Sequence, residues 1–257
     1  MKRIKNQPKI TLIGAGPGSA DLITVRGLRA LRTADVVLYD ALANAELLNN
    51  VPKNALKIDV GKRANKHRFT QSEINLMAVG YAFSHGHVVR LKGGDPFIFG
   101  RGQEELQYAE AFNIETVVVP GVSSSTALAA LQQVPLTHRE YSQSFWVLTG
   151  TTKYGELPSD FSLAAQSNST LVVLMGLKKL AEITSLLRKH RKHDTPVMVI
   201  QNGSLANEKV AIGTIKNIAK SVHEKNIQTP AIIVIGEVVG LHPTLARDYA
   251  IATALKN

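Results

Sequence analysis

Gly93-Gly94-Asp95-Pro96-Phe97-Ile98-Phe99-Gly100-Arg101-Gly102 is the stretch that bears most strongly on the fold of this chain. It follows an apolar run at residues 88–91, which predicts a buried strand, and it precedes residues 103–106, which predict the first turn of a helix. Glycines, an acid and a proline at the end of a strand place bare backbone at the carboxyl edge of a sheet, where open α/β sheets hold ligands. The stretch therefore predicts a ligand-binding loop; a glycine pair alone would indicate an ordinary strand-to-helix connection.

Similar apolar runs precede and follow this stretch and alternate with helical patterns. The alternation predicts a mainly parallel five-stranded sheet in an N-terminal α/β domain over residues 1–120. The helices are expected at 71–83, at 102–112 and from near Asp21, the last with Leu22, Val25, Leu28 and Leu31 three apart on one side. The strands are expected at 10–13, 36–39, 56–60, 88–91 and 116–119.

A second series of apolar runs predicts a C-terminal α/β domain over residues 121–257. Its strands are expected at 145–150, 170–175, 197–200, 209–213 and 231–235. Residues 201–208 are too short a connection for a helix, so the third and fourth of these strands should pair antiparallel and make the sheet mixed. We expect a ligand cleft between the two domains.

The composition limits the class of protein. The 257 residues, 44% of them apolar, suffice for one large domain or two of about half that size. No apolar stretch is long enough to cross a bilayer, and residues 1–8 do not resemble a secretory signal, so we expect a soluble cytoplasmic protein. The absence of cysteine excludes disulfides, thiolate zinc sites and a cysteine nucleophile, and we expect no metal.

The chain is strongly basic, with 30 Lys and Arg against 20 Asp and Glu and a formal net charge of +10. Such an excess attracts anions: nucleic acid, a membrane surface or a polycarboxylate. The basic residues are dispersed apart from residues 62–68 and 188–193, and the aromatic residues are few, which argues against a nucleic-acid stacking platform. We expect neither a nucleic-acid nor a membrane partner, although a phosphate-binding surface stays open. The run at 187–193 is interpreted as a solvated helix end.

Three further segments carry polar groups at predicted strand ends. The turn at 14–18 has the spacing G-x-G-x-G, and Pro17 removes an amide that would face a pyrophosphate, so we discount a dinucleotide. Asp40 ends a predicted strand and could act as a base or cap a turn. Residues 61–71 form a polar segment with four cations, which suits a substrate with several carboxylates or is simply an exposed loop. The hydroxyl run at 123–126 could leave amides for a ligand or be a redundant helix cap.

Taken in order, these motifs resemble the tetrapyrrole methylase family of class III S-adenosylmethionine-dependent methyltransferases, over residues 10–239. The runs at 90–102 and 135–139 narrow the resemblance to the uroporphyrinogen branch. The motifs that carry it are Gly14-Ala15-Gly16-Pro17-Gly18, Val36-Val37-Leu38-Tyr39-Asp40, Gly61-Lys62-Arg63 with His67 and Gln71, Arg90-Leu91-Lys92 into Gly93 to Gly102, Pro120-Gly121-Val122, and Pro135-Leu136-Thr137-His138-Arg139.

The resemblance implies transfer of two methyl groups from S-adenosyl-L-methionine to ring carbons of uroporphyrinogen III, giving precorrin-2 for sirohaem or cobalamin, by a homodimer. It implies that Asp40 is the proton acceptor and Lys62 the proton donor. The implied cofactor contacts are Pro17, Gly93, Gly94, Asp95, Ile98, Ser123, Ser124, Met175 and Gly203. The cations expected to contact the substrate's carboxylates are Arg63, His67, Arg90, Arg101 and Arg139.

The sequence departs from the family pattern at two places. Ser123-Ser124 stands where threonine and alanine are usual, and Gln132-Gln133 stands where small Ala-Gly is typical. Neither departure removes a proposed reacting group. The alternatives to this reading are a family member that acts on later corrin-pathway intermediates, an RNA-directed methyltransferase on the same fold, and a module that binds S-adenosylmethionine without turnover.

Overall fold

The computed structural model describes residues 7–61 and 69–245, and its contacts divide the chain into two compact units, residues 1–123 and 124–257. The predicted boundary lay after residue 120. Each unit contains one five-stranded sheet. No helix in the described part of the chain is long and apolar enough to cross a membrane.

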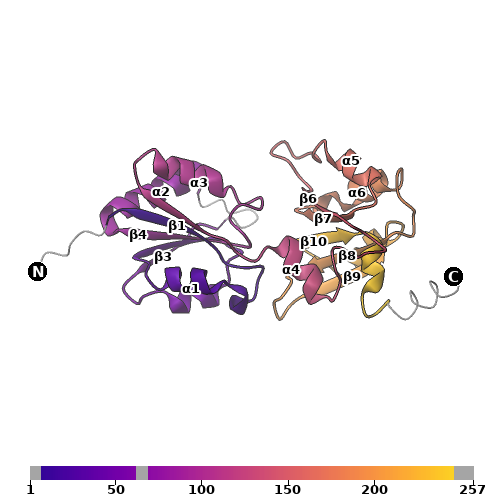
Figure 1. Cartoon of the computed structure of the whole chain (residues 1–257), viewed down its shortest axis with the longest axis horizontal. Coiled ribbons are helices and arrows are strands. Elements are labelled where there is room, and N and C mark those ends of the chain that lie inside the picture. Colours follow the sequence, from indigo (N-terminus) through magenta and orange to yellow (C-terminus); the bar gives the residue numbers. More distant parts are fainter. Residues whose placement is uncertain (1–6, 62–68, 246–257) are drawn as a thin grey trace, which may run out of the picture. The chain divides into compact units, whose positions relative to one another are not determined.

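The first unit is built on a fully parallel sheet in the order β3-β2-β4-β1-β5, which confirms the predicted mainly parallel sheet. Helices α2 (Gln71–His85) and α3 (Gly102–Glu110) cover one face and α1 (Val25–Leu31) lies on the other (Figure 1). The strands are β1 (Lys9–Gly14), β2 (Val36–Tyr39), β3 (Leu56–Asp59), β4 (His87–Lys92) and β5 (Glu115–Val119). The central strands are buried on both faces, as expected for parallel strands between helical layers.

The start of the first helix differs from the prediction. A 3-10 turn, Ala20–Leu22, comes first, and α1 begins only at Val25. Thr24 caps α1, because its hydroxyl accepts a hydrogen bond from the Gly27 amide at 3.1 Å, and a capped start fixes where the helix begins. Val25, expected on one side of that helix with Leu22, Leu28 and Leu31, is 64% exposed.

The second unit contains a mixed sheet in the order β6-β7-β10-β8-β9. Strands β8 and β9 pair antiparallel, as predicted from their short connection, and β6 pairs parallel with β7. Helices α5 (Phe161–Gln166) and α6 (Leu180–Leu187) lie on one face and α4 (Ser124–Leu131) on the other (Figure 1). The strands are β6 (Phe145–Thr149), β7 (Thr170–Leu174), β8 (Pro196–Gln201), β9 (Lys209–Thr214) and β10 (Ala231–Ile235).

The remaining helical segments are short. Helix α7 follows β9, and three further 3-10 segments connect the larger elements. These are α7 (Ile218–Glu224), η2 (Ala45–Asn50), η3 (Leu177–Lys179) and η4 (Glu237–Leu241).

The basic run after α6 is only partly the solvated helix end that was predicted. Residues 188–190 are exposed, but Arg191 is half-buried. Its guanidinium donates to the carbonyls of Ala164 at 3.1 Å and Ser169 at 2.8 Å, so it ties α5 to the start of β7. Arg191 is therefore a structural residue, because its donors are already used by main-chain carbonyls.

Candidate functional site

The loops that follow β1 and β4 are joined to each other at the carboxyl edge of the first sheet. The Gly94 amide donates to the Gly16 carbonyl at 2.8 Å, and the Gly16 amide donates to the Gly94 carbonyl at 3.3 Å. Both residues have positive φ, +84° at Gly16 and +64° at Gly94, which glycine adopts without steric cost. The parallel sheet thus brings the turn at 14–18 and the loop at 93–102 together, because each follows a parallel strand of the same sheet.

Asp95 holds the loop after β4 to the loop after β5. Its Oδ1 accepts a hydrogen bond from the Phe97 amide at 2.8 Å, and its Oδ2 accepts one from the Gly121 amide at 3.0 Å. Gly121 packs so closely that a Cβ on it would lie 2.2 Å from the Gly94 carbonyl oxygen. Asp95, a predicted cofactor contact, therefore also fixes the shape of the loop edge.

The backbone at Gly94 borders open space. A Cβ built on Gly94 would meet no atom within 4 Å, whereas a Cβ on Gly93 would lie 2.7 Å from Leu42 Cβ. Pro17 lies half-buried next to Gly16, and Ile98 is 40% exposed within the same loop. The structure therefore brings Pro17, Gly93, Gly94 and Ile98 to one edge of the first unit, with bare main chain facing unfilled space.

A carboxylate and a buried guanidinium meet at the same edge. Asp40 follows β2, and its Oδ1 lies 2.5 Å from Nη2 of Arg90 on the neighbouring strand β4. The Arg90 side chain is 3% exposed and that of Asp40 is 28% exposed. Arg90, which was predicted to contact substrate, also donates from Nη1 to the Leu38 carbonyl at 3.3 Å.

Glu105 of α3 lies on the other side of Arg90. Its Oε1 is 2.8 Å from Lys92 Nζ, 2.9 Å from Gln71 Nε2 and 3.4 Å from Arg90 Nε. Glu105, Lys92 and Arg90 are all buried. Burial lowers the pKa of Lys92, and the nearby charge of Arg90 lowers it further, while Glu105 opposes both effects. Two cations and two carboxylates therefore form a cluster of balanced charge, in which Asp40 is partly exposed and the other three residues are buried.

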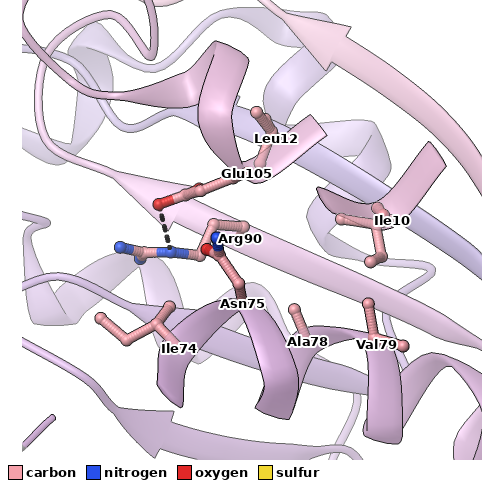
Figure 2. Close-up of a pocket in the computed structure, with 9 residues that line it drawn as sticks. Ile10, Leu12, Ile74, Asn75, Ala78, Val79, Arg90 and Glu105 are labelled. Carbon is pink, nitrogen blue, oxygen red and sulfur yellow. Dashed lines mark ion pairs between the residues drawn. The ribbon is translucent and has the colours of Figure 1, made fainter. Parts of the chain in front are cut away.

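A small pocket adjoins this cluster under α2 and α3. Figure 2 shows the side chains of Arg90 and Glu105 pointing toward each other at its wall, with Asn75 beside them. Its volume of about 10 Å³ would hold about one water molecule. The pocket is therefore too small for a nucleoside or a macrocycle. Its lining residues are Ile10, Leu12, Ile74, Asn75, Ala78, Val79, Arg90, Glu105 and Ala109.

Two predicted cofactor residues lie at strand ends of the second unit. Met175 follows β7, has a φ of +57° and is 50% exposed. Gly203 comes shortly after β8, which runs in the same direction as β7 because both pair antiparallel with β10. A Cβ on Gly203 would lie 2.5 Å from the side chain of Leu128 in α4, so a larger residue there would force that side chain to shift.

The two glutamines that depart from the family pattern follow α4. The amides of Gln133 and Val134 donate to the carbonyls of Ala130 and Ala129, a Schellman helix end with Gln133 in the left-handed region at φ +58°. The preceding Gln132 donates from Nε2 to Glu208 Oε1 at 2.7 Å. Glycine suits the backbone at 133 better, which gives a physical reason for the family's usual residue.

The other predicted residues are less closely grouped. Arg101 is exposed and pairs with Glu104 at 2.6 Å, and hydrogen bonding to Glu104 raises its pKa above the usual value. Arg139 is exposed, and Ser124 is the first residue of α4, directly after Ser123. Lys62, Arg63 and His67 lie outside the described residues.

Sequence reasoning gave no role to Glu105, Lys92 or Gln71. A signal for them was present: the strand His-Val-Val-Arg-Leu-Lys carries two cations among apolar residues, and buried cations require carboxylate partners. Glu105, in the first turn of the helix that follows, is the partner that the fold supplies.

Comparisons with known proteins agree with these motifs. Residues 9–219 match the model of the tetrapyrrole (corrin/porphyrin) methylases. A curated siroheme synthase from Actinobacillus pleuropneumoniae serotype 7 is 46% identical over 239 residues, 93% of this chain and 49% of the relative. The chain thus spans about half the length of the curated relatives it matches.

Two solved structures are similar along nearly their whole length. Both are of uroporphyrin-III C-methyltransferase from Thermus thermophilus, one in the native form and one in complex with S-adenyl homocysteine. Each is 35% identical, has a TM-score of 0.77, and aligns over 91% of this chain and 99% of its own.

Proposed function

The chain belongs to the tetrapyrrole methylase family, and from that premise we propose that it transfers two methyl groups from S-adenosyl-L-methionine to ring carbons of uroporphyrinogen III. The products would be precorrin-2, for sirohaem or cobalamin synthesis, and S-adenosyl-L-homocysteine. The observation that carries the proposal is the 35% identity to a uroporphyrin-III C-methyltransferase over 99% of that chain. The runs at 90–102 and 135–139 support the same substrate.

The glycine loops of the first unit fit the proposed cofactor. Gly94 presents main chain to open space, and Asp95 keeps the neighbouring loop in place through the Gly121 amide. A bare backbone with free space above it suits a nucleoside that lies close to main chain. The residues that would hold the cofactor are Pro17, Gly93, Gly94, Asp95, Ile98, Ser123, Ser124, Met175 and Gly203.

The sulfonium group of the bound cofactor supplies an already activated methyl group. The protein's main tasks are then to position an electron-rich ring carbon and to move a proton. Asp40 is proposed to accept that proton, since its carboxylate is partly open while Arg90 fixes its orientation. Lys62 is proposed as the proton donor.

The basic excess suits the proposed substrate, which is a polycarboxylate. Arg101 and Arg139 are exposed, and we propose that they bind carboxylates of the substrate. Arg63 and His67 are proposed to bind other carboxylates of the same substrate. Arg90 is 3% exposed, so we propose that it acts by orienting Asp40 and does not itself contact the substrate. We also propose that the protein is a cytoplasmic homodimer, on the strength of the family resemblance.

The test is turnover under anaerobic conditions with uroporphyrinogen III and S-adenosyl-L-methionine, followed by product mass. The proposal predicts that each tetrapyrrole gains two methyl groups and that two molecules of S-adenosyl-L-homocysteine form for each tetrapyrrole. No gain in mass, in a protein that binds S-adenosyl-L-homocysteine tightly, would contradict the proposed substrate. A gain of methyl groups only with a later corrin intermediate would reassign the substrate within the family.

A further inference from the structure

The buried charge cluster of the first unit extends from the sheet edge into the layer between the sheet and α3. Arg90 and Lys92 both point from β4 toward the side covered by α3, where Glu105 lies between them. A buried charge is costly unless it is paired and hydrogen-bonded. Both cations therefore depend on the carboxylate of Glu105, and Arg90 depends in addition on Asp40.

The atoms of Arg90 divide between its two acidic partners. Nη2 contacts Asp40, and Nη1 donates to the carbonyls of Leu38 and Leu91, each at 3.3 Å. The remaining donor, Nε, is buried and makes no hydrogen bond to the described residues, but it faces Glu105 Oε1 at 3.4 Å. Glu105 is thus the acid that faces the stem side of the guanidinium, while Asp40 binds its far end.

Glu105 is itself held from two directions. Lys92 Nζ and Gln71 Nε2 both bond to its Oε1, at 2.8 and 2.9 Å. Lys92 belongs to β4 and Gln71 begins α2, so the carboxylate is fixed to both the sheet and the neighbouring helix. A carboxylate held in this way is a rigid support for a guanidinium.

We propose that Glu105 is a positioning residue for methyl transfer: it holds the guanidinium of Arg90, which in turn holds the carboxylate of Asp40 in the orientation needed to accept a proton. This inference rests on the proposed function, because it takes Asp40 as the proton acceptor. Glu105 is buried, so its effect on turnover passes through Arg90 and Asp40.

The first test compares Glu105→Gln with Glu110→Gln, the same change at an exposed position of the same helix. We expect kcat to fall at least about tenfold in Glu105→Gln, with the Kd for S-adenosyl-L-homocysteine within about twofold of wild type. Glu110→Gln should leave both unchanged. An equal loss of kcat and cofactor affinity would indicate a merely structural role and overturn the proposal.

A double-substitution cycle tests whether the effect passes through Asp40. In the Asp40→Asn background, Glu105→Gln should lower the residual turnover by less than about twofold, because residues that act in one chain are not additive. If the two losses multiply, Glu105 acts by another route and the proposal is wrong.

Loss of Glu105 leaves two buried cations with one carboxylate and could prevent folding. The paired variant Glu105→Gln/Lys92→Met removes one charge of each sign and keeps the cluster neutral, while Arg90 still lacks its support. We expect it to melt closer to wild type than Glu105→Gln does and still to turn over at least about tenfold slower. Turnover within about twofold of wild type would overturn the positioning role.

A readout that needs no turnover separates this inference from the proposed function. The side-chain Nε–Hε signal of Arg90, identified by its loss in Arg90→Lys, should exchange slowly with water in the wild-type protein and at least about tenfold faster in the paired variant. If exchange is faster in the paired variant but the wild-type protein methylates no uroporphyrinogen III, the proposed function fails and the support of Arg90 stands. Unchanged exchange in the paired variant contradicts the support itself.

Discussion

Nη2 of Arg90 lies 2.5 Å from Oδ1 of Asp40, so a guanidinium that is sealed between the sheet and α3 holds a carboxylate that remains partly open. Arg90 lies in β4 and Asp40 directly follows the adjacent parallel strand β2, so the two meet near the carboxyl ends of these strands. This arrangement fixes the orientation of the acid without covering it, which is what a proton acceptor requires.

Replacement of Asp40 by asparagine should abolish most of the turnover. We expect kcat to fall about 10²- to 10⁴-fold, the range typical of a lost general base, with cofactor affinity within a few-fold of wild type. Asp35→Asn is the matched control. Asp35 directly precedes the first residue of β2, at the end away from Asp40, and it accepts a hydrogen bond from the His87 amide at 2.9 Å. Steady-state kinetics and calorimetric titration measure both quantities, and a comparable loss of kcat in the control would remove the special role of Asp40.

Two glycine substitutions should separate ligand binding from stability. Gly94→Ala places a methyl group in open space, so we expect a stability cost of about 1 kcal/mol from its positive φ but at least about tenfold weaker binding of S-adenosyl-L-homocysteine. Gly121→Ala would place Cβ 2.2 Å from the Gly94 carbonyl oxygen and should destabilise the protein by about 1–3 kcal/mol or more. Urea unfolding measures the stability of each variant, and calorimetry measures its affinity for S-adenosyl-L-homocysteine. Unimpaired binding by Gly94→Ala would mean that the cofactor binds elsewhere.

Gln133→Gly should stabilise the second unit. Gln133 adopts φ +58° at the Schellman end of α4, where a non-glycine residue is strained and glycine is not. Glycine removes the strain but also gives the unfolded chain more conformational entropy, which opposes part of the gain. We therefore expect a net increase of about 0.5–1 kcal/mol in the free energy of unfolding. Asn113→Gly at the corresponding end of α3 is the comparison and should gain less, because asparagine tolerates φ +54°. A loss of stability in Gln133→Gly would contradict this reading of the helix end.

Acidification should weaken the first unit through His87. Burial lowers the pKa of His87 below 6.5, and its ring is held between Thr11 Oγ1 at 2.8 Å and the Thr33 carbonyl at 3.1 Å. Since the unfolded chain takes up this proton at a higher pH than the folded protein, the free energy of unfolding should fall as pH drops below about 6.5 toward the folded pKa.

Denaturant unfolding at pH 7 and pH 5 measures this loss. The decrease should be smaller in His87→Gln, which cannot titrate. Carboxylates whose pKa is lowered, such as Glu73, lose their contribution at lower pH and do not account for a change that begins near neutrality. An equal decrease in both proteins would assign the effect to other groups.

Much of the fold could be predicted because its strands are short apolar runs with glycine or proline at their ends. The antiparallel pairing of β8 and β9 followed from the brevity of one connection. The start of α1 was missed because the spacing of Leu22 and Val25 looked helical, while the actual start is set by the Thr24 cap, a local hydrogen bond that competes with periodicity. The Thr24 cap, and not the spacing of apolar residues, therefore determines where α1 begins.

The candidate site was predicted unevenly for a different reason. Sequence order placed Gly94 and Asp40 at one sheet edge, since parallel strands end together. It could not show that Arg90 points into the protein, because the direction of a strand side chain depends on register, and a slip of one residue would reverse it. Glu105 was missed for the same reason: its role exists only once α3 is packed on the sheet.

Methyl transfer with ¹³C-methyl-labelled S-adenosyl-L-methionine tests the central claim most directly. With anaerobic uroporphyrinogen III, we predict two labelled methyl groups per product molecule, both with the carbon chemical shifts of methyl groups bonded to carbon. Label on oxygen, as in methyl esters of the carboxylates, or no label in the tetrapyrrole at all, would contradict the account.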